Sequence, residues 1–541
     1  MSKNLQIIPL GGLGGIGKNM TVFEYGRNLL VVDCGIMFPA NDMHGIDLIL
    51  PDFDYVVEHQ DKLRGIVITH GHMDHIGGLP HLLRELDAPI DIYGTPLTLG
   101  LIERQLAEKH LMDKAQLREM PRKRALQLGP FQVNAFAVAH SIPDAVGFVI
   151  NTPVGKVVHT GDYKLDETPA GGRTTDLAAL RRLTKKGVLA MLGDSTNADQ
   201  PGRTQTERVV RESLDRLFTE AKGHRIIIAT FSSLLARLQE ILDLAQQHRR
   251  KVVLTGRSLV ENIELARKLG YLKVADGLIV DRPKGIRPEN LVVLATGSQG
   301  EPRSALNRMS EGSHRQVTIR SGDTVIISGG TIPGNEEDVG RMINNLFERG
   351  ANVIYGAMAT VHVSGHGSRG DMQAMLDTVK PRFLIPVHGE SRHLHLHKQL
   401  AQTAGMQADR VFILKEGEPF VSDGSKAWTG KALEMADVLI DGRLVGEIGE
   451  IVVRDRHRLS QDGFVVALIP INKKHQLAGE PQIISRGFVH LDRSGDLLDA
   501  SRKEIKRQVK RGNRDLRRPL ENLFYQATQS RPVVLPQFIR V

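Results

Sequence analysis

The sequence of 541 residues contains a single cysteine, few aromatic residues and no long apolar run. One thiol, Cys34, excludes a disulfide framework and a cysteine-built zinc site, and it fits a reducing compartment. Aromatic residues make up only 4% of the chain, which does not provide for extensive stacking of bases. No segment is long enough to span a bilayer, and the N-terminus lacks the apolar core of a signal peptide. We therefore expect a cytoplasmic protein with no membrane segment.

The bulk composition is that of a globular protein with more than one domain. Apolar residues account for 41% of the chain and charged residues for 25%, and the length exceeds that of a usual single domain. The formal charge is +9 and the sequence pI is about 9.5. A basic excess of this kind favours a polyanionic partner.

The most informative stretch combines three histidines and one aspartate within six residues. It directly follows the apolar run Ile66–Ile68, which is typical of a strand. His70 and His72 are two residues apart and can face one centre, whereas the adjacent Asp74 and His75 diverge and suit a second centre. Imidazole and carboxylate ligands favour zinc or manganese. Two such ions roughly 3.5–4 Å apart can stabilise both oxygens of an in-line displacement at phosphorus.

Further candidates follow apolar segments later in the chain. His140, Asp162, Asp194 and His388 each stand at the end of a predicted strand, and 362–366 is a histidine-containing loop. Taken singly, such residues are more often structural. Taken together with the first motif, His140 and Asp162 complete two coordination spheres, with Asp162 able to bridge them, and His388 also suits a metal. By contrast, alternate histidines at 393, 395 and 397 lie on a predicted helix and do not share a face, so we expect them to be structural.

The glycine-rich segment Gly11–Asn19 offers an alternative function that we reject. It imitates a dinucleotide fingerprint, with Asp33 further on, and it nearly matches a phosphate-binding P-loop. Both motifs require a helix next, but residues 20–32 favour strand, turn and strand. We expect the glycines to let a turn pack close to the metal centre.

Residues 204–350 alternate helices with short apolar strands, which predicts an inserted α/β domain with a parallel sheet. Its polar loops at 230–233, 295–302 and 328–334 either bind phosphates or are ordinary turns. The stretch 501–519 is strongly basic and is either merely solvated or in contact with RNA or a neighbouring subunit. Asp47 and Asp441 could contribute to a calcium site.

With these residues placed, the chain resembles the bacterial ribonuclease J family, in the β-CASP branch of the metallo-β-lactamase superfamily. The order of the motifs carries the resemblance across nearly the whole length. It implies an α/β fold: a metallo-β-lactamase αββα sandwich interrupted by a β-CASP domain, followed by a small α+β domain. The expected parts are the first metallo-β-lactamase segment 1–203, the β-CASP domain 204–350, the last metallo-β-lactamase segment 351–430, a linker 431–459 and the C-terminal domain 460–541.

The resemblance also implies an activity and a set of site residues. The expected enzyme is a two-metal ribonuclease, a 5′-to-3′ exonuclease with endonuclease activity, acting in RNA maturation and decay. It would use two divalent ions, zinc or manganese, on single-stranded RNA with a 5′-monophosphate, as a homodimer or homotetramer, with possible protein partners in RNA decay. The expected metal ligands are His70, His72 and His140 for one ion, Asp74, His75 and His388 for the other, and Asp162 between them. Catalytic roles fall on Asp74 and on Asp194 with His366 as general acid, and substrate binding on Phe231, Ser232, Ser233, His362, Val363, Ser364, Gly365 and His366.

Two other functions share part of these features. A metallo-hydrolase of a small ester or thioester would use the same first motif, but the large insertion and the basic C-terminal region argue against it. A non-catalytic RNA-binding subunit would have lost metal ligands, whereas every ligand position is intact.

Overall fold

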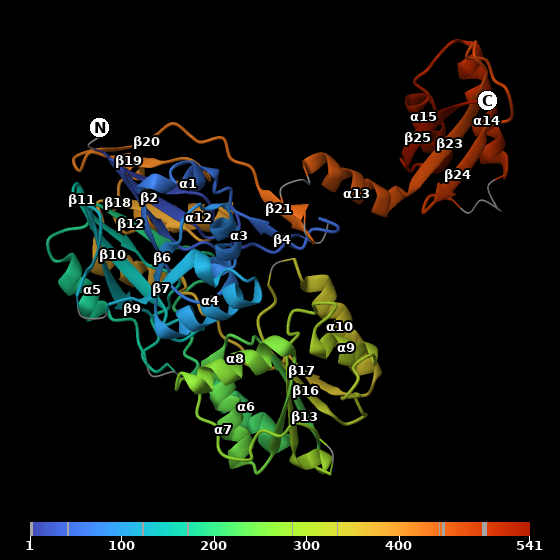
Figure 1. Ribbon diagram of the computed structural model, residues 1–541. Helices are drawn as coiled ribbons and strands as arrows, with labels where there is room; N and C mark the ends of the chain where they lie inside the picture. Colours follow the sequence, from blue (N-terminus) through green and yellow to red (C-terminus); the bar gives the residue numbers. More distant parts are fainter. Residues whose placement is uncertain are drawn as a thin grey trace. The chain divides into compact units, whose positions relative to one another are not determined.

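The structure is a computed structural model that describes residues 4–40, 43–121, 124–169, 173–283, 285–332, 334–442, 444–445, 449–489 and 495–541. The chain forms two compact units, Met1–Phe38 with Leu50–Asp437, and Pro39–Ile49 with Val438–Val541. Figure 1 shows the elements of both in sequence colours. Within the described residues, no helix has the length and apolar character needed to cross a bilayer.

Two sheets stack face to face in the first unit. Their facing side chains, among them Phe23, Phe131, Phe148 and Phe420, form one buried apolar core. The first sheet has the strand order β20 (Ala427–Thr429), β19 (Phe420–Ser422), β1 (Leu5–Pro9), β2 (Thr21–Tyr25), β3 (Asn28–Val32), β5 (Leu63–Val67), β6 (Ile90–Gly94), β7 (Ala115–Glu119). The second has the order β18 (Phe383–Val387), β12 (Ala190–Asp194), β11 (Gly155–His159), β10 (Val146–Thr152), β9 (Phe131–Ala137), β8 (Leu126–Leu128).

Helices cover the outer faces of these sheets, so the expected αββα sandwich is confirmed. On the first sheet α4 contacts β6 and β7, and on the second α5, α11 and α12 contact β9, β12 and β18 respectively. A second apolar core fills the space between the second sheet and its helices. The helices and short 3-10 turns of this region are α1 (Asp54–Glu58), η1 (Gln60–Lys62), α2 (Met73–Ile76), α3 (Leu79–Glu85), α4 (Pro96–Glu108), η2 (Met112–Lys114), α5 (Leu177–Thr184), α11 (Arg369–Val379), α12 (Ser391–Thr403) and η4 (Ala408–Arg410).

An α/β domain is inserted between β12 and β18, which pair as parallel neighbours although they are far apart in sequence. Its sheet is entirely parallel, as predicted, and its central strands are fully buried apolar runs such as Ile226–Thr230. The strand order is β14 (Lys251–Thr255), β15 (Leu291–Ala295), β13 (Ile226–Thr230), β16 (Thr324–Ser328), β17 (Asn352–Ile354). The helices are α6 (Arg208–Glu220), α7 (Leu235–Gln247), α8 (Arg257–Lys268), η3 (Pro288–Asn290), α9 (Ala305–Glu311) and α10 (Glu336–Glu348).

The second unit contains two small sheets. The first joins β22 (Leu444–Val445), β21 (Val438–Asp441) and β4 (Leu48–Leu50), and helix α13 (Glu450–Asp462) follows it. Here Asp47 accepts a hydrogen bond from the Gly442 amide (2.7 Å), and Asp441 pairs with Arg456 (2.7 Å). Neither aspartate belongs to a group of three donor side chains in the described part of the chain, so the calcium site stays a prediction.

The C-terminal part of this unit packs two helices against one face of a three-stranded sheet. Strand order is β24 (Gln482–Arg486), β23 (Phe464–Ile471), β25 (Val533–Arg540), and the helices are α14 (Gly495–Lys510) and α15 (Arg517–Thr528). Ile505, Leu516 and Phe524 join the sheet residues in its core. Ile505 and Leu516 are buried, whereas Val509 is only partly buried.

Candidate metal centre

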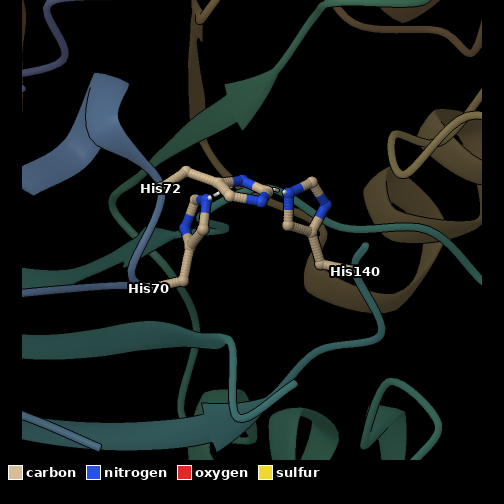
Figure 2. Close-up of side chains that lie close together, drawn as sticks. All are labelled: His70, His72 and His140. Atoms are coloured by element: carbon tan, nitrogen blue, oxygen red, sulfur yellow. Dashed lines mark hydrogen bonds between the residues drawn. The ribbon is translucent and has the colours of Figure 1, made fainter. Parts of the chain in front are cut away.

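Strand β5 ends in the apolar core, and the short loop that joins it to α2 carries the first two histidines of the motif. His70 and His72 lie on this loop, and His140 follows the end of β9. The Nε2 atom of His70 lies 3.0 Å from Nδ1 of His72, and Nε2 of His140 lies 3.2 Å from the same atom. Figure 2 shows the three rings converging. Ligand nitrogens of a tetrahedral zinc ion at about 2.0–2.1 Å would stand roughly 3.3 Å apart. The spacing therefore fits one ion.

Four more side chains converge beside this group. Nε2 of His388 lies 3.2 Å from Oδ2 of Asp74, and Nε2 of His75 lies 3.1 Å from Oδ2 of Asp162. Asp74, His75, Asp162 and His388 together offer donor atoms within 4.8 Å of one another. The structure thus brings all seven sequence-predicted metal ligands together in two adjacent groups.

One oxygen stands between the two groups. Oδ2 of Asp162 lies 3.6 Å from His70 Nε2 and 3.8 Å from His140 Nε2 on one side. On the other side it lies 3.1 Å from His75 Nε2 and 3.6 Å from His388 Nε2. A carboxylate in this position can contact ions in both groups.

Burial determines the protonation state of His70, His72 and His140, whereas nearby carboxylates determine that of His75. Burial lowers the pKa of His70 and His140 well below the usual value and that of His72 to about 4, which keeps these rings neutral and able to bind a metal. Burial also lowers the pKa of His75, but Asp162, Asp74 and Asp33 raise it more, so that the net pKa is well above the usual value. Three carboxylates around one imidazole create a field that attracts a cation.

Four of the metal-facing histidines, His70, His75, His140 and His388, are held by a hydrogen bond at the other ring nitrogen. Nδ1 of His75 contacts Oδ2 of Asp33 (2.8 Å), and Nδ1 of His140 contacts the Gly365 carbonyl (2.9 Å). Nδ1 of His388 contacts Oγ1 of Thr196 (2.6 Å), and Nδ1 of His70 contacts Oγ1 of Thr69 (3.1 Å). Such contacts fix the ring orientation and increase the basicity of the ligating nitrogen.

Asp194 and His366 form a hydrogen-bonded pair beside the two groups of donor side chains. Nδ1 of His366 lies 2.8 Å from Oδ2 of Asp194, and its Nε2 lies 4.0 Å from Oδ2 of Asp162. Burial lowers the pKa of His366, but Asp194 and then Asp162 and Asp74 raise it to about 9. The side chains of His366 and Asp74 are 18% and 29% exposed, whereas Asp162 is 3% exposed, so solvent reaches the site on the His366 and Asp74 side.

The predicted substrate-binding residues come from two loops of the first unit. Phe231 packs near His362, with ring centroids 6.3 Å apart. Ser364 accepts hydrogen bonds through Oγ from Asn197 Nδ2 (2.8 Å) and from the His366 amide (3.1 Å). Val363 is buried, and the Ser232 carbonyl accepts a hydrogen bond from Asn262 Nδ2 (3.0 Å). Ser233 is partly buried just before the start of α7.

The sequence is similar over its full length to curated bacterial ribonucleases. Ribonuclease J 1 of Streptococcus pyogenes is 39% identical over 548 residues, covering 98% of this chain and 97% of that protein. Ribonuclease J2 of Bacillus subtilis is 38% identical, covering 100% of this chain and 99% of that protein. Ribonuclease J of Thermus thermophilus is 39% identical, covering 99% of this chain and 95% of that protein. The chain belongs to the ribonuclease J family.

Family models divide the ribonuclease J chain into four matched segments. "Beta-lactamase superfamily domain" matches residues 30–181, and "Ribonuclease J, beta-CASP domain" matches 223–346. "Zn-dependent metallo-hydrolase RNA specificity domain" matches 352–414, and "Ribonuclease J C-terminal domain" matches 451–541. A crystal structure of an Enterococcus faecalis protein of unknown function shares the fold, with a TM-score of 0.53 at 14% identity, covering 77% of this chain and 100% of that one. The resemblance and the fold class inferred from the sequence are confirmed.

Asp33 is a residue of the site whose role the sequence did not reveal. It has a positive φ of 61° and is 1% exposed, and besides His75 it accepts hydrogen bonds from the Thr69 amide and hydroxyl (2.8 Å each). The one signal in the sequence was an acidic residue at the end of β3, beside the strand that carries the motif. The glycine loop was placed correctly: the Gly12 carbonyl accepts a hydrogen bond from the His388 amide (2.8 Å).

We expect Asp33→Asn to weaken metal binding by about 10–100-fold, because it removes the charge that supports His75. Asparagine keeps the shape and tolerates the left-handed backbone, so the fold should persist. Competition with a chromogenic chelator would measure the affinity. The control is Asp91→Asn, which should bind metal normally. Asp91 lies on β6 and pairs with Arg118 of β7 (2.7 Å). Equal affinity in both variants would remove Asp33 from the site.

Proposed function

We propose that the chain hydrolyses RNA phosphodiesters with the help of divalent metal ions, as a 5′-to-3′ exonuclease with endonuclease activity. The observation that carries the proposal is the pair of adjacent donor groups with the Asp162 carboxylate between them, in a chain of the ribonuclease J family. A match to a zinc-dependent metallo-hydrolase RNA specificity domain supports both the metal and the substrate. The biological setting would be RNA maturation and decay.

The ligand assignment follows the two groups. His70, His72 and His140 would hold one ion, Asp74, His75 and His388 would hold the other, and Asp162 would bridge them. This donor set of imidazole and carboxylate suits zinc and also accepts manganese. When bound, such ions stabilise charge on the phosphate oxygens and lower the pKa of water to about 7.

The chain's own residues then complete the reaction. Water attacks phosphorus in line, the bond from phosphorus to the 3′-oxygen breaks, and the products carry a 5′-phosphate and a 3′-hydroxyl. His366 would donate the proton that the leaving 3′-oxygen needs, and Asp194 would hold its ring through the 2.8 Å contact at Nδ1. The side-chain exposure of His366 leaves room for a substrate beside it.

The loops 231–233 and 362–366 would bind the 5′-terminal phosphate and the adjacent backbone. His362 lies opposite Phe231, and its Nδ1 atom is buried with no hydrogen-bond partner among the described residues. Burial lowers the pKa of His362 to about 4, so it would meet the substrate as a neutral ring. Hydroxyls of Ser232, Ser233 and Ser364 and the backbone of Val363 and Gly365 would supply the other polar contacts.

Several wider features belong to the same proposal. We propose a cytoplasmic homodimer or homotetramer that acts on single-stranded RNA with a 5′-monophosphate, with protein partners in RNA decay. The domain boundaries after 203, 350, 430 and 459 are also proposals, and helix α13 (Glu450–Asp462) runs across the last of them.

A time course on RNA labelled at a 5′-monophosphate, beside DNA of the same sequence, tests the function. The protein would first be stripped of metal with a chelator and then supplied with zinc or manganese. We expect metal-dependent release of labelled mononucleotide from RNA, at a higher rate than from DNA. No cleavage of RNA with either metal, by a folded protein, would contradict the proposal and favour a binding role.

A further inference from the structure

Much of the positive charge of the chain lies in the C-terminal segment 495–541, which contains α14, α15 and β25. Residues 495–541 contain eleven lysines and arginines against five aspartates and glutamates, a net charge of +6, while the whole chain carries +9. Within this segment, 510–518 contains five cationic residues and a single acid, Asp515. Metal binding and hydrolysis, as proposed above, use none of these residues.

Part of this charge has a structural explanation. Arg507 pairs with Glu504 (2.7 Å), Arg517 pairs with Glu521 (3.0 Å), and Lys506 pairs with Glu480. Arg507 and Lys510 also lie in the last turn of α14, where cations complement the helix dipole. These contacts stabilise the domain without any partner.

Four cations cluster around the turn between α14 and α15, and we call them the α14–α15 cationic surface: Lys510, Arg511, Arg514 and Arg518. All four are exposed, and within the described residues none of them forms an ion pair. They are close in sequence around the turn between two packed helices, so they repel one another.

The start of α15 makes this arrangement less favourable still. Arg517 and Arg518 occupy the first turn, which contains no acid, and the positive end of the helix dipole disfavours cations there. The carboxylate of Asp515 accepts a hydrogen bond from the Arg517 amide (3.1 Å) and offsets only part of this charge. The helix dipole therefore accounts for Lys510 at the end of α14 but not for Arg514 and Arg518, whereas a bound polyanion would account for all four residues.

We propose that the α14–α15 cationic surface contacts the phosphate backbone of single-stranded RNA, in addition to the contacts at the metal site. The inference rests on RNA as the substrate. Contact with phosphates is independent of sequence, adds affinity in proportion to the phosphates engaged, and weakens with salt. Long RNA would thus gain affinity from these residues, while an oligonucleotide of a few residues, filling only the metal site, would not.

The test compares two variants that each remove four positive charges. One changes Lys510, Arg511, Arg514 and Arg518 to glutamine. The other changes Arg181, Arg182, Lys185 and Lys186 to glutamine; these residues are also exposed but lie at the C-terminal end of α5, where the helix dipole explains them. Binding of long single-stranded RNA would be measured in chelator over a range of salt concentrations, and cleavage of a short RNA would be measured with metal.

For the α14–α15 variant we expect the Kd for long RNA to rise about tenfold at low salt. The slope of log affinity against log salt concentration should fall by about 0.7 for every phosphate that the variant no longer engages. The kcat/KM on the short RNA should not change, and the α5 variant should bind long RNA nearly as the wild type does. A third variant with Arg511, Arg514 and Arg518 changed to lysine keeps the charge and should keep binding, which separates removal of charge from misfolding.

Three results would overturn the inference. The first is normal binding of long RNA by the α14–α15 glutamine variant. The second is an equal loss of RNA affinity in both glutamine variants, which would indicate a general charge effect. A changed molar mass in solution with normal RNA binding would assign the residues to a subunit contact. Failure of the wild type to cleave the short RNA would contradict the proposed function alone, because RNA binding is measured separately.

Discussion

Asp162→Asn is expected to remove bound metal and to lower RNA hydrolysis by at least about 10⁴-fold, because water has a pKa near 15.7 without a metal and near 7 with one. The carboxylate oxygen of Asp162 lies within 4.0 Å of ring nitrogens from both donor groups, so one substitution affects both. Asparagine preserves the side-chain shape but loses the charge. Metal content by atomic spectroscopy and single-turnover cleavage of RNA would measure the two effects.

His366→Ala is the informative contrast to this variant. If His366 acts as a general acid, the protein should retain its metal and lose about 10²–10⁴-fold in turnover. An RNA with sulfur in place of the leaving 3′-oxygen needs little protonation, so this substrate should restore much of the lost rate. Full loss of metal in His366→Ala, or no rescue by the sulfur substrate, would assign His366 to metal binding instead. Retention of metal and activity by Asp162→Asn would contradict the bridging role.

The sequence predicted which side chains converge at the candidate metal centre because each of them follows an apolar strand. The spacing of His70, His72, Asp74 and His75 is local, and the distant residues come to the same place because strands of both stacked sheets end at the site: β5 of the first sheet and β9, β11 and β18 of the second. What the sequence could not show was how each imidazole is held. Thr196 supports His388 across 192 positions, and the carbonyl of Gly365 supports His140 across 225. A backbone carbonyl has no sequence signature at all.

The fold was predictable to a similar degree. Continuous apolar runs such as Ile226–Thr230 indicated buried parallel strands, and the alternation of strands and helices indicated the inserted domain. Short elements were harder, since α9 (Ala305–Glu311) has only seven residues and depends on tertiary packing. Val509 lies four residues after the buried Ile505 on α14 but is only partly covered, because helical periodicity gives the direction of a side chain and not the extent of its neighbours.

A buried ion network in the first unit was not predictable, since its members are far apart in sequence. Arg237 of α7 is 0% exposed. Its Nη1 donates to Oγ of Ser328 (2.6 Å) and to the Val361 carbonyl (2.7 Å), and its Nη2 donates to Glu207. Glu207 also lies 3.5 Å from Nζ of Lys164, two residues after Asp162. Arg237 thus ties the inserted domain to the segments that enter and leave it.

We expect Arg237→Met to lower the free energy of unfolding by about 3–5 kcal/mol, because removing one partner leaves the buried carboxylate of Glu207 without its main counter-charge. Methionine fills similar space, so the loss would not arise from a large cavity. Urea unfolding followed by circular dichroism would measure it. The control is Arg208→Met, whose partner Glu212 (2.9 Å) is exposed on α6, and which should cost about 0.5 kcal/mol or less.

The double variant Arg237→Met with Glu207→Gln separates charge from packing. If the unpaired carboxylate causes the loss, neutralising it should make the double variant more stable than the sum of the single changes by about 1–3 kcal/mol. Lys164 would keep its contact with Asp166 (3.5 Å), so it would not become a new unpaired charge. Strict additivity, or a loss in Arg237→Met no larger than in Arg208→Met, would mean that Arg237 acts by packing and by its hydrogen bonds to Ser328 and Val361.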